Sequence, residues 1–269
     1  MDAVINVPIC ELMSRPEPCC PRADEALLGW PAEVLDFPNP GWVRLRTHYR
    51  YEGYVRAEEV ATGARAARWA ALPKRLVLQA AADVLSGPAV ECWPVTTLVR
   101  GCLVSPVGEP DAGGWQRVRL PDGRSGYTKS DYLGTYYENP PVLPEVELRR
   151  RIADGALGYL GVQYRWGGKT PLGLDCSGLT AMAYLLQGIL IYRDARIEEG
   201  FPIHAIDRAR MDVADLLYFP GHVALYLGEG RYVHATALSG RVVINSLDPS
   251  ARDYRESLAQ ELLAVGSWF

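Results

Sequence analysis

Residues 174–188 read LDCSGLTAMAYLLQG, a mostly apolar stretch that opens with Asp175 and ends at Gly188. Aspartate is a favoured N-cap and glycine a favoured residue at a helix end, so this pattern predicts a helix from Cys176 to Gln187. Cys176 then lies in the first turn, where unpaired backbone N–H groups and the helix dipole favour a thiolate over a thiol. The stretch therefore predicts a cysteine nucleophile, although a lone cysteine beside a helix cap is more often structural.

A cysteine nucleophile needs a base, and the sequence contains four histidines. Two of them, His222 and His234, lie in alternating apolar runs on either side of a glycine-rich turn at residues 228–230, a pattern that predicts a β-hairpin. A three-residue turn pairs Ala224 with His234. Both imidazoles then lie on one face of the hairpin as diagonal neighbours, about 7–8 Å apart at the backbone. One histidine can therefore orient the ring of the other and fix its tautomer for work as a base.

Taken alone, each histidine has a simpler interpretation. A strand histidine is more often a half-buried residue with satisfied hydrogen bonds than a catalytic group. His48 falls in a predicted hairpin loop and His204 in a loop after a Phe-Pro pair, so we expect both at the surface. The combination of Cys176 with the two hairpin histidines is what favours catalysis.

The first half of the chain contains an internal repeat. The sequence GWVRLR at residues 41–46 recurs as GWQRVR at residues 114–119, and a Gly-Tyr pair follows 11 and 12 residues after each tryptophan. Short alternating runs broken by turns predict strands in both copies, which indicates one structural unit used twice. The W-x-x-V and G-Y pattern resembles bacterial SH3-like domains, which implies two small β-barrels. Residues 61–82, rich in alanine and arginine, are expected to form a helix or turn between them.

We therefore expect three units along the chain. They are SH3-like domain 1 at residues 1–66, SH3-like domain 2 with its connecting segment at residues 67–140, and a different domain at residues 141–269. Periodicity predicts helices at residues 145–160 and 176–187 in this last unit, and the hairpin supplies paired strands. The third domain is therefore expected to be α+β.

Composition and charge narrow the class of protein. The chain has 269 residues, 48% of them hydrophobic, and a formal net charge of −4, with −2 in residues 1–140 and −2 in residues 141–269. Nucleic acids and anionic membranes attract clustered positive charge, so neither is expected as a partner. No run approaches the roughly 20 apolar residues of a membrane helix. The opening residues do not resemble an export signal, so a cytoplasmic protein is expected, or a periplasmic or wall-associated one if a leader was removed.

The six cysteines do not form a disulfide or zinc pattern. The chain is larger than disulfide-dependent scaffolds, Cys19 and Cys20 are adjacent, and no CxxC pair occurs. The five cysteines other than Cys176 are expected to be buried thiols in a reducing compartment. No metal or other cofactor is expected.

The motifs of the C-terminal half resemble, in order, those of the NlpC-type cell-wall cysteine peptidases over residues 145–269. They are YRWGG (164–168), DCSG (175–178), DLLYF (215–219), GHVALYLG (221–228) and YVHA (232–235). The resemblance implies a compact papain-like domain that cleaves peptidoglycan stem peptides without a cofactor. It also implies that Cys176 is the nucleophile, His222 the base and His234 the third, orienting residue.

The same resemblance implies further site residues. The backbone N–H of the nucleophile and the side chain of Tyr164 are expected near the oxyanion. Relatives with paired SH3-like domains use the Asp before the Cys and the Ser after it to grip a free α-amino group, and these residues are Asp175 and Ser177 here. A tyrosine of the first SH3-like domain closes that end of the cleft in such relatives, and Tyr51 is the matching choice. Trp166 is expected to contact the substrate.

The predicted reaction is hydrolysis of the γ-D-glutamyl–diamino acid bond in murein peptides with a free N-terminal L-Ala. Two other functions stay open: a peptidoglycan-binding module with weak or no hydrolase activity, and an acyltransferase that passes the thioester to an amine or lipid. Two departures from the family pattern affect specificity and leave the nucleophile and base unaltered. Ala214 replaces a usual glycine, and Tyr192 and Ala195 replace the proline and the hydroxyl of a P-R-D-S/T segment.

Overall fold

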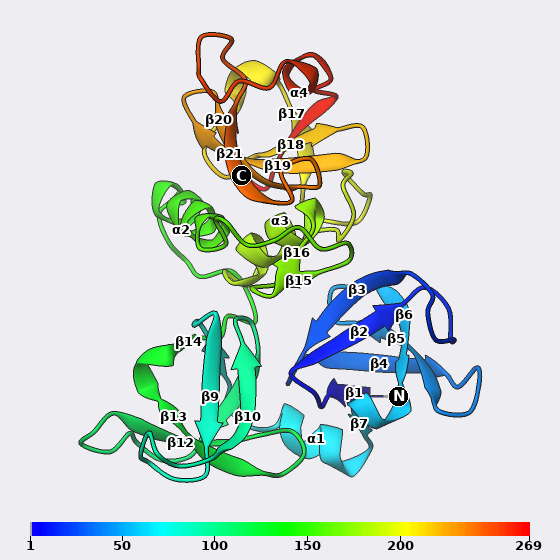
Figure 1. Cartoon of the computed structure of the whole chain (residues 1–269), viewed down its shortest axis with the longest axis vertical. Helices are drawn as coiled ribbons and strands as arrows, with labels where there is room; N and C mark the ends of the chain where they lie inside the picture. Colours follow the sequence, from blue (N-terminus) through cyan, green and yellow to red (C-terminus); the bar gives the residue numbers. More distant parts are fainter. Residues whose placement is uncertain (1) are drawn as a thin grey trace. The chain divides into compact units, whose positions relative to one another are not determined.

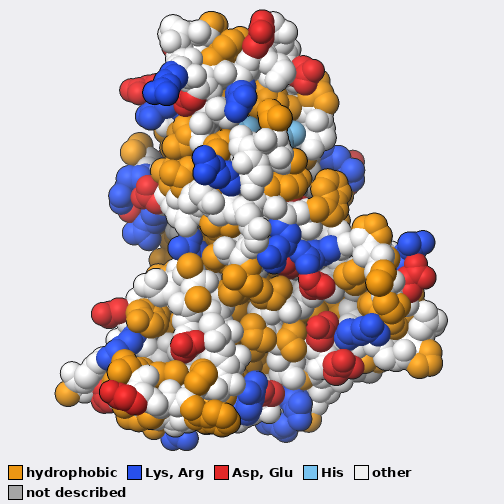
Figure 2. All heavy atoms as spheres, in the orientation of Figure 1, with side chains coloured by type: hydrophobic (Ala, Val, Ile, Leu, Met, Phe, Trp, Pro, Cys, Tyr) orange, Lys and Arg blue, Asp and Glu red, His pale blue; other side chains and the backbone are white. Residues whose placement is uncertain are grey.

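The computed structural model describes residues 2–269 and divides into two compact units, one up to Tyr136 and one from Tyr137 onward (Figure 1). Two antiparallel sheets make up most of the N-terminal unit, and a sheet packed with helices makes up the C-terminal unit. No helix within the described residues is long and apolar enough to cross a membrane. Side chains of both charge signs are interspersed over the face shown in Figure 2, in keeping with the even charge distribution of the sequence.

The first sheet has seven strands in the order β3-β2-β6-β5-β4-β1-β7. The strands are β1 (Asp2–Ile5), β2 (Ile9–Met13), β3 (Arg22–Leu27), β4 (Pro31–Asp36), β5 (Trp42–Thr47), β6 (Glu52–Arg56) and β7 (Val60–Thr62). A short 3-10 helix, η1 (Ala57–Glu59), lies between β6 and β7. Alternating burial along β5 and β6 turns one face of these strands into the core, as expected for a half-buried sheet.

The second sheet repeats this topology strand for strand. Its order is β10-β9-β13-β12-β11-β8-β14, which is the first order with every label raised by seven. The strands are β8 (Arg75–Val77), β9 (Ala81–Leu85), β10 (Pro94–Val99), β11 (Leu103–Pro106), β12 (Trp115–Arg119), β13 (Ser125–Lys129) and β14 (Leu133–Thr135), with η2 (Ser130–Tyr132) before the last. The prediction of one unit used twice is therefore confirmed, whereas the assignment of SH3-like barrels and the domain bounds stay predictions.

The repeated tryptophans occupy matching places in the two sheets. Trp42 is the first residue of β5 and lies opposite Arg56 of β6. Trp115 is the first residue of β12 and lies opposite Lys129 of β13. In both pairs the cation lies 4.1 Å from the centre of the indole ring. A cation over an aromatic face is favourable, so the repeat preserves a cross-strand contact as well as a turn.

The segment at residues 61–82 is only partly helical, which corrects its predicted structure. Helix α1 covers Ala64–Ala70, and strands on either side of it join the two sheets: β7 pairs with β1 at the edge of the first sheet, and β8 lies between β11 and β14 in the second. Alanine and arginine favour a helix, but strand pairing overrides this preference at both ends. The indole N–H of Trp69 in α1 donates to the carbonyl oxygen of Gly29 at 2.9 Å and anchors the helix to the first sheet.

Two expectations about exposed and buried residues were wrong. His48 is half-buried and packs edge-on against Trp30, with 5.0 Å between ring centres, because the β5–β6 loop folds back over the sheet. Cys19 is exposed in the β2–β3 connection and Cys92 is half-buried, whereas the other cysteines of this unit are buried. His204 is exposed as expected, although it belongs to a strand and not to a loop.

The C-terminal unit is α+β, as predicted. Its main sheet has the antiparallel order β17-β22-β18-β19-β20-β21, and two short strands, β15 and β16, form a separate pair. The strands are β15 (Lys169–Thr170), β16 (Gly173–Leu174), β17 (His204–Ile206), β18 (Leu216–Phe219), β19 (His222–Gly228), β20 (Arg231–Thr236), β21 (Arg241–Ser246) and β22 (Ala264–Ser267). The helices are α2 (Glu145–Leu157), α3 (Cys176–Leu185) and α4 (Glu256–Gln260), with η3 (Arg208–Arg210) as a single turn.

Helix α3 is the central element of this unit. Eight of its ten residues are buried, and it packs against α2 on one side and against β19 and β20 on the other. A helix that is apolar all round requires such enclosure. Beyond its end, Gly188 has a positive φ of 72°, as expected for a glycine that terminates a helix. The nucleophile candidate is therefore carried at the N-terminus of the most enclosed helix.

The aspartate of the DLLYF motif, Asp215, makes a buried ionic contact. The carboxylate of Asp215 is fully buried and accepts hydrogen bonds from Arg149 of α2 at 2.9 Å and from Ser267 of β22 at 2.6 Å. The preceding residue, Ala214, has a φ of 72°, a left-handed conformation that costs an alanine about 1–2 kcal/mol. This strain explains why glycine is the usual residue of the family there.

Candidate active site

The first turn of α3 is organised by its N-cap. Asp175 has extended backbone angles, and its Oδ1 accepts a hydrogen bond from the backbone N–H of Gly178 at 2.7 Å, which confirms the predicted cap. Cys176 follows as the first helical residue and is 7% exposed. The sulfur is thus held on a rigid element, just below the surface of the unit.

Two glycines bring the loop of residues 164–168 against this turn. A Cβ on Gly178 would lie 2.1 Å from the carbonyl oxygen of Gly168, so no side chain fits between the two backbones. The carboxylate Oδ2 of Asp175 also accepts the backbone N–H of Gly167 at 2.8 Å. The YRWGG and DCSG motifs therefore form a single packed substructure, and their glycines are needed for the close approach.

The electrostatic setting of Cys176 differs from the expectation of a stabilised thiolate. Burial, and then the adjacent Asp175 carboxylate, raise the pKa of the thiol, while backbone N–H groups of Val223 and Ser177 act in the opposite direction. Burial and a like charge outweigh the helix N-terminus, whose effect is modest. A raised pKa favours the neutral thiol, which loses its proton to a base as it attacks.

The two hairpin histidines are in direct contact. Leu225 pairs with Val233 in the β19–β20 hairpin, the register that the three-residue turn predicts. The Nε2 atom of His222 lies 2.7 Å from the Nδ1 atom of His234, and the rings meet edge to face at 5.0 Å between centres. Val223, whose N–H reaches the sulfur of Cys176, is the residue next to His222. The structure therefore places the two histidines in contact and brings the strand that carries His222 against the sulfur of Cys176.

A third residue, Asn245 of β21, fixes the tautomers of this pair. Its side-chain Oδ1 lies 3.0 Å from Nε2 of His234, and its Nδ2 donates to the carbonyl oxygen of Asp253 at 2.8 Å. Since Oδ1 can only accept, Nε2 of His234 carries a proton and its Nδ1 is free to accept one from Nε2 of His222. This chain of donors leaves the lone pair of His222 on Nδ1, which is then the basic nitrogen.

Tyr164 lies beside the sulfur, as predicted for a residue near the oxyanion. Burial raises the pKa of its phenol to about 12, and the proximity of Cys176 and Asp175 acts in the same direction. The hydroxyl is therefore protonated at neutral pH and able to donate a hydrogen bond. Such a donor next to a nucleophile can stabilise negative charge that develops on a carbonyl oxygen.

Asp175 and Ser177, the predicted amine-binding pair, share a buried cationic partner. Arg193, which is 2% exposed, donates to both carboxylate oxygens of Asp175 at 3.0 and 3.1 Å and to Oγ of Ser177 at 2.7 Å. The carboxylate of Asp175, which was expected to bind the ammonium group of a substrate, is thus already paired with the guanidinium of Arg193. Its role in gripping a free amine stays a prediction.

Comparison with known proteins identifies the family. A model of the NlpC/P60 family matches residues 161–259. Dipeptidyl-peptidase 6 of Lysinibacillus sphaericus is 40% identical over 276 aligned positions, which cover 100% of both chains. The chain belongs to the NlpC/P60 family. Its members are peptidases that act on peptidoglycan.

Other NlpC/P60 relatives extend the comparison. Gamma-D-glutamyl-L-lysine dipeptidyl-peptidase of Bacillus cereus is 31% identical over 140 residues, 49% of this chain and 41% of that protein. The crystal structure of an NlpC/P60 family protein from Bacillus cereus superposes with a TM-score of 0.84 at 21% identity, and covers 100% of this chain and 99% of that one. The shared fold therefore includes the N-terminal sheets as well as the NlpC/P60 domain.

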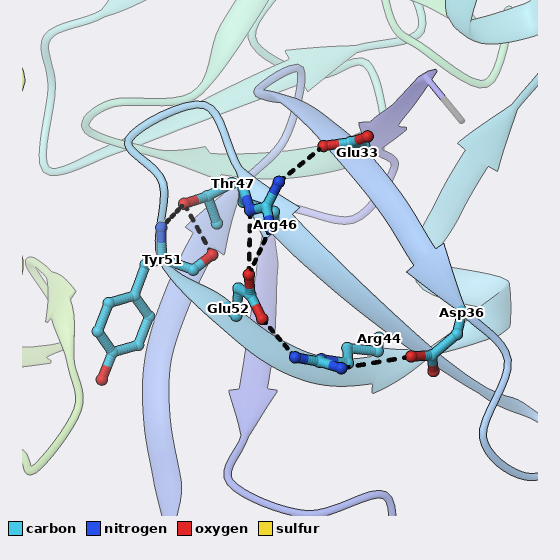
Figure 3. Close-up of polar contacts among 7 residues, drawn as sticks. All are labelled: Glu33, Asp36, Arg44, Arg46, Thr47, Tyr51 and Glu52. Carbon is cyan, nitrogen blue, oxygen red and sulfur yellow. Dashed lines mark hydrogen bonds and ion pairs between the residues drawn. The ribbon is translucent and has the colours of Figure 1, made fainter.

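The remaining predicted site residues of this NlpC/P60 protein are less enclosed. Trp166 is 69% exposed in the loop before the nucleophile. Figure 3 shows Tyr51 at the β5–β6 hairpin, where Thr47 fixes its backbone: its N–H donates to Oγ1 of Thr47 at 3.0 Å, and its carbonyl accepts the Thr47 N–H at 2.8 Å. The phenol ring points away from the ionic network that Glu52 forms with Arg44 and Arg46. Substrate contacts of Trp166 and Tyr51 stay predictions.

Arg193 and Asn245 are functional candidates that the sequence did not reveal. The only available signal was the segment at residues 192–196, where Arg193 keeps the arginine of the family pattern. Asn245 lies in β21 without any motif around it. Arg193 reaches the site from an irregular segment 18 residues after Asp175, and Asn245 reaches it from the strand paired with β20. No motif marks either contact.

His222, the predicted base, is held neutral by its surroundings. Burial, and then the neighbouring His234, lower the pKa of His222 from 6.5 to about 4. Between these two values the unfolded chain binds more protons than the folded one, so protonation favours unfolding. The contribution of His222 to the free energy of unfolding is complete above about pH 6.5, and it is lost as the pH falls toward 4.

A pH profile tests this assignment. Because His222 stays unprotonated down to low pH, kcat/KM at pH 5 is expected to remain within about twofold of its value at pH 7, whereas a base with an ordinary pKa of 6.5 loses about 25-fold. The measurement is the initial rate of peptide cleavage from pH 4.5 to 8, with circular dichroism at each pH to confirm that the protein is folded. A tenfold or larger loss at pH 5 in folded protein contradicts the lowered pKa.

Proposed function

We propose that this NlpC/P60 protein is a cysteine peptidase that hydrolyses the γ-D-glutamyl–diamino acid bond of murein peptides with a free N-terminal L-Ala. The observation that carries the proposal is the 2.7 Å contact between His222 and His234 next to the buried Cys176 at the start of α3. A nucleophile, a base and a residue that orients the base are the requirements of covalent acyl transfer.

The proposed reaction begins with the neutral thiol. As the sulfur of Cys176 attacks the γ-carbonyl carbon of D-Glu, Nδ1 of His222 takes the thiol proton, and His234 holds the ring through the other nitrogen. The negative charge on the carbonyl oxygen is stabilised by the backbone N–H of Cys176 and the hydroxyl of Tyr164. His222 then gives its proton to the leaving amine, and a thioester remains on the enzyme.

The second half of the reaction regenerates the enzyme. Water replaces the departed amine, His222 takes its proton as the oxygen attacks the thioester carbon, and the sulfur leaves and recovers the proton as a thiol. The products are a peptide that ends in γ-D-Glu and an amine of the diamino acid. No residue other than these needs to change its protonation state.

The substrate class is supported by the relatives. One is named as a dipeptidyl-peptidase and another as a gamma-D-glutamyl-L-lysine dipeptidyl-peptidase. Release of a dipeptide implies recognition of a free amino end two residues before the cleaved bond. Because Arg193 already pairs with Asp175, that carboxylate does not by itself explain the recognition of a free amine. The requirement for a free amine is therefore tested directly.

The test compares L-Ala-γ-D-Glu-diaminopimelate with the same tripeptide acetylated at its N-terminus. We expect release of L-Ala-γ-D-Glu from the free tripeptide and a kcat/KM at least about 30-fold lower for the acetylated one, because a charge-assisted hydrogen bond is lost. Mass spectrometry of the products gives both rates. Equal rates contradict selection of a free amine and leave the peptidase in place.

The same reaction mixtures separate the alternative functions. A hydrolase adds water to the D-Glu product, whereas an acyltransferase gives a product whose mass includes an added amine acceptor. A binding module leaves the tripeptide intact. Absence of cleavage with correctly folded protein therefore refutes the proposed function.

A further inference from the structure

A cavity lies directly beside the histidine pair. It has a volume of about 220 Å³. Its polar lining comes from the two histidines, Asn245, Thr236, Ser239, Arg255 and Ser257, and its apolar lining from Leu238 and Leu258. No Asp or Glu is among its lining residues. In the upper part of Figure 2, histidine atoms and Lys or Arg atoms lie close together on the face of the C-terminal unit. The cavity therefore combines one arginine and several hydroxyl groups with an apolar wall, next to His222.

Arg255 is the only cation that lines this recess, and its guanidinium is not engaged within the protein. The side chain is half-buried, yet within residues 2–269 it makes no hydrogen bond or ion pair. A guanidinium presents several donors in one plane, a geometry that matches a carboxylate. An unpaired and partly desolvated arginine next to hydroxyl groups is suited to bind an anion.

The backbone that carries Arg255 is fixed in place. Its N–H donates to the carbonyl oxygen of Ser246 in β21 at 3.2 Å. Two residues earlier, the carbonyl of Asp253 accepts Nδ2 of Asn245, the same side chain that orients His234. The histidine pair and the arginine are thus positioned by one set of contacts to β21.

The chemistry of the proposed reaction determines which part of the substrate enters this recess. His222 must protonate the leaving nitrogen, so the leaving residue has to lie against His222. That residue is a diamino acid, whose α-carbon bears both the leaving nitrogen and a carboxyl group. The recess is walled by His222 and contains an arginine, so it is the candidate place for this carboxyl group.

We propose that the recess is a subsite for a carboxylate of the leaving diamino residue, with Arg255 as its cationic partner and Ser239 and Ser257 as hydroxyl donors. The inference rests on the proposed hydrolysis of a γ-D-glutamyl–diamino acid bond and adds the recognition of its leaving side. The carboxylate has two sources: the α-carboxylate of a C-terminal diamino acid, or the side-chain carboxylate that diaminopimelate has and lysine lacks.

Four peptides distinguish these sources. They are L-Ala-γ-D-Glu-L-Lys and L-Ala-γ-D-Glu-diaminopimelate, each with its α-carboxyl group free or converted to an amide. The lysine amide has neither carboxylate and serves as the reference. Arg255→Gln is expected to lower kcat/KM by about 10- to 100-fold, relative to this reference, for every peptide that carries the recognised carboxylate.

The pattern of losses identifies the source. A loss for both free acids and for neither amide indicates the α-carboxylate, whereas a loss for both diaminopimelate peptides and for neither lysine peptide indicates the side chain. Any effect of Arg255 on the neighbouring His234 is common to all four peptides and cancels in the ratio. Arg252→Gln is the matched control, since Arg252 is an exposed arginine on the same segment and does not line the recess.

Two outcomes overturn the subsite. If the wild-type protein cleaves the peptides and Arg255→Gln changes all four rates equally, the subsite is absent and the proposed function stands. If the wild-type protein cleaves none of them, the proposed function fails, and calorimetric binding to the Cys176→Ala protein decides the subsite independently. Binding that favours the acids over the lysine amide only when Arg255 is present supports it, and equal binding of all four peptides rejects it.

Discussion

Cys176→Ala is expected to abolish cleavage of L-Ala-γ-D-Glu-diaminopimelate, with kcat lower by at least about four orders of magnitude. The reason is that the sulfur forms the bond to the acyl group, and neither the oxyanion donors nor His222 can replace it. Folding is expected to persist, because the Asp175 cap and the packing of α3 do not depend on the sulfur. The measurement is product release followed by mass spectrometry over hours, with circular dichroism of the variant.

The exposed Cys19 provides the matched control for this substitution. Cys19→Ser is expected to retain full activity. Alkylation by iodoacetamide has to be mapped residue by residue, because Cys19 is accessible whereas burial raises the pKa of Cys176. Loss of activity is expected to follow modification of Cys176 and not of Cys19, and EDTA is expected to have no effect. Substantial hydrolysis by Cys176→Ala, or inactivation by EDTA alone, argues against a cysteine mechanism and for a metal.

The parts of the site that the sequence predicted correctly are those determined by neighbouring residues. Asp175 and Gly188 mark the two ends of α3 because caps act within one turn of a helix. The turn at residues 228–230 sets the hairpin register, and the register alone places His222 and His234 on one face. Local rules were therefore sufficient to bring the reacting histidines together.

The parts that the sequence did not predict depend on side-chain contacts between elements. Arg193 reaches Asp175 from an irregular segment 18 residues further on, and Asn245 reaches His234 from the next strand. No periodicity or cap signals such contacts, since they arise only when the elements pack. The electrostatic state of Cys176 was mispredicted for the same reason: burial raises the pKa of the thiol, and burial is a property of the folded unit.

The second large effect is expected at Arg193, where the substitution Arg193→Met should lower the free energy of unfolding by about 3–5 kcal/mol. The substitution leaves Asp175, which is 8% exposed, as a buried charge without its cation. Solvating such a charge is costly, whereas methionine fills much of the same volume and so separates the charge effect from a cavity. Chemical denaturation with urea, followed by circular dichroism, measures the loss.

Two further variants show whether the buried charge is the cause. Arg150→Met removes an exposed ion pair with Glu147 on α2 and is expected to cost less than about 1 kcal/mol. Combining Arg193→Met with Asp175→Asn removes the uncompensated charge and keeps an N-cap acceptor, so the double variant is expected to be more stable than Arg193→Met alone. Because Asp175 also holds Gly167 and the first turn of α3, kcat should fall with stability in the single variant. A loss at Arg193 no greater than that at Arg150 would show that the pair beside the nucleophile is not needed to hold the site together.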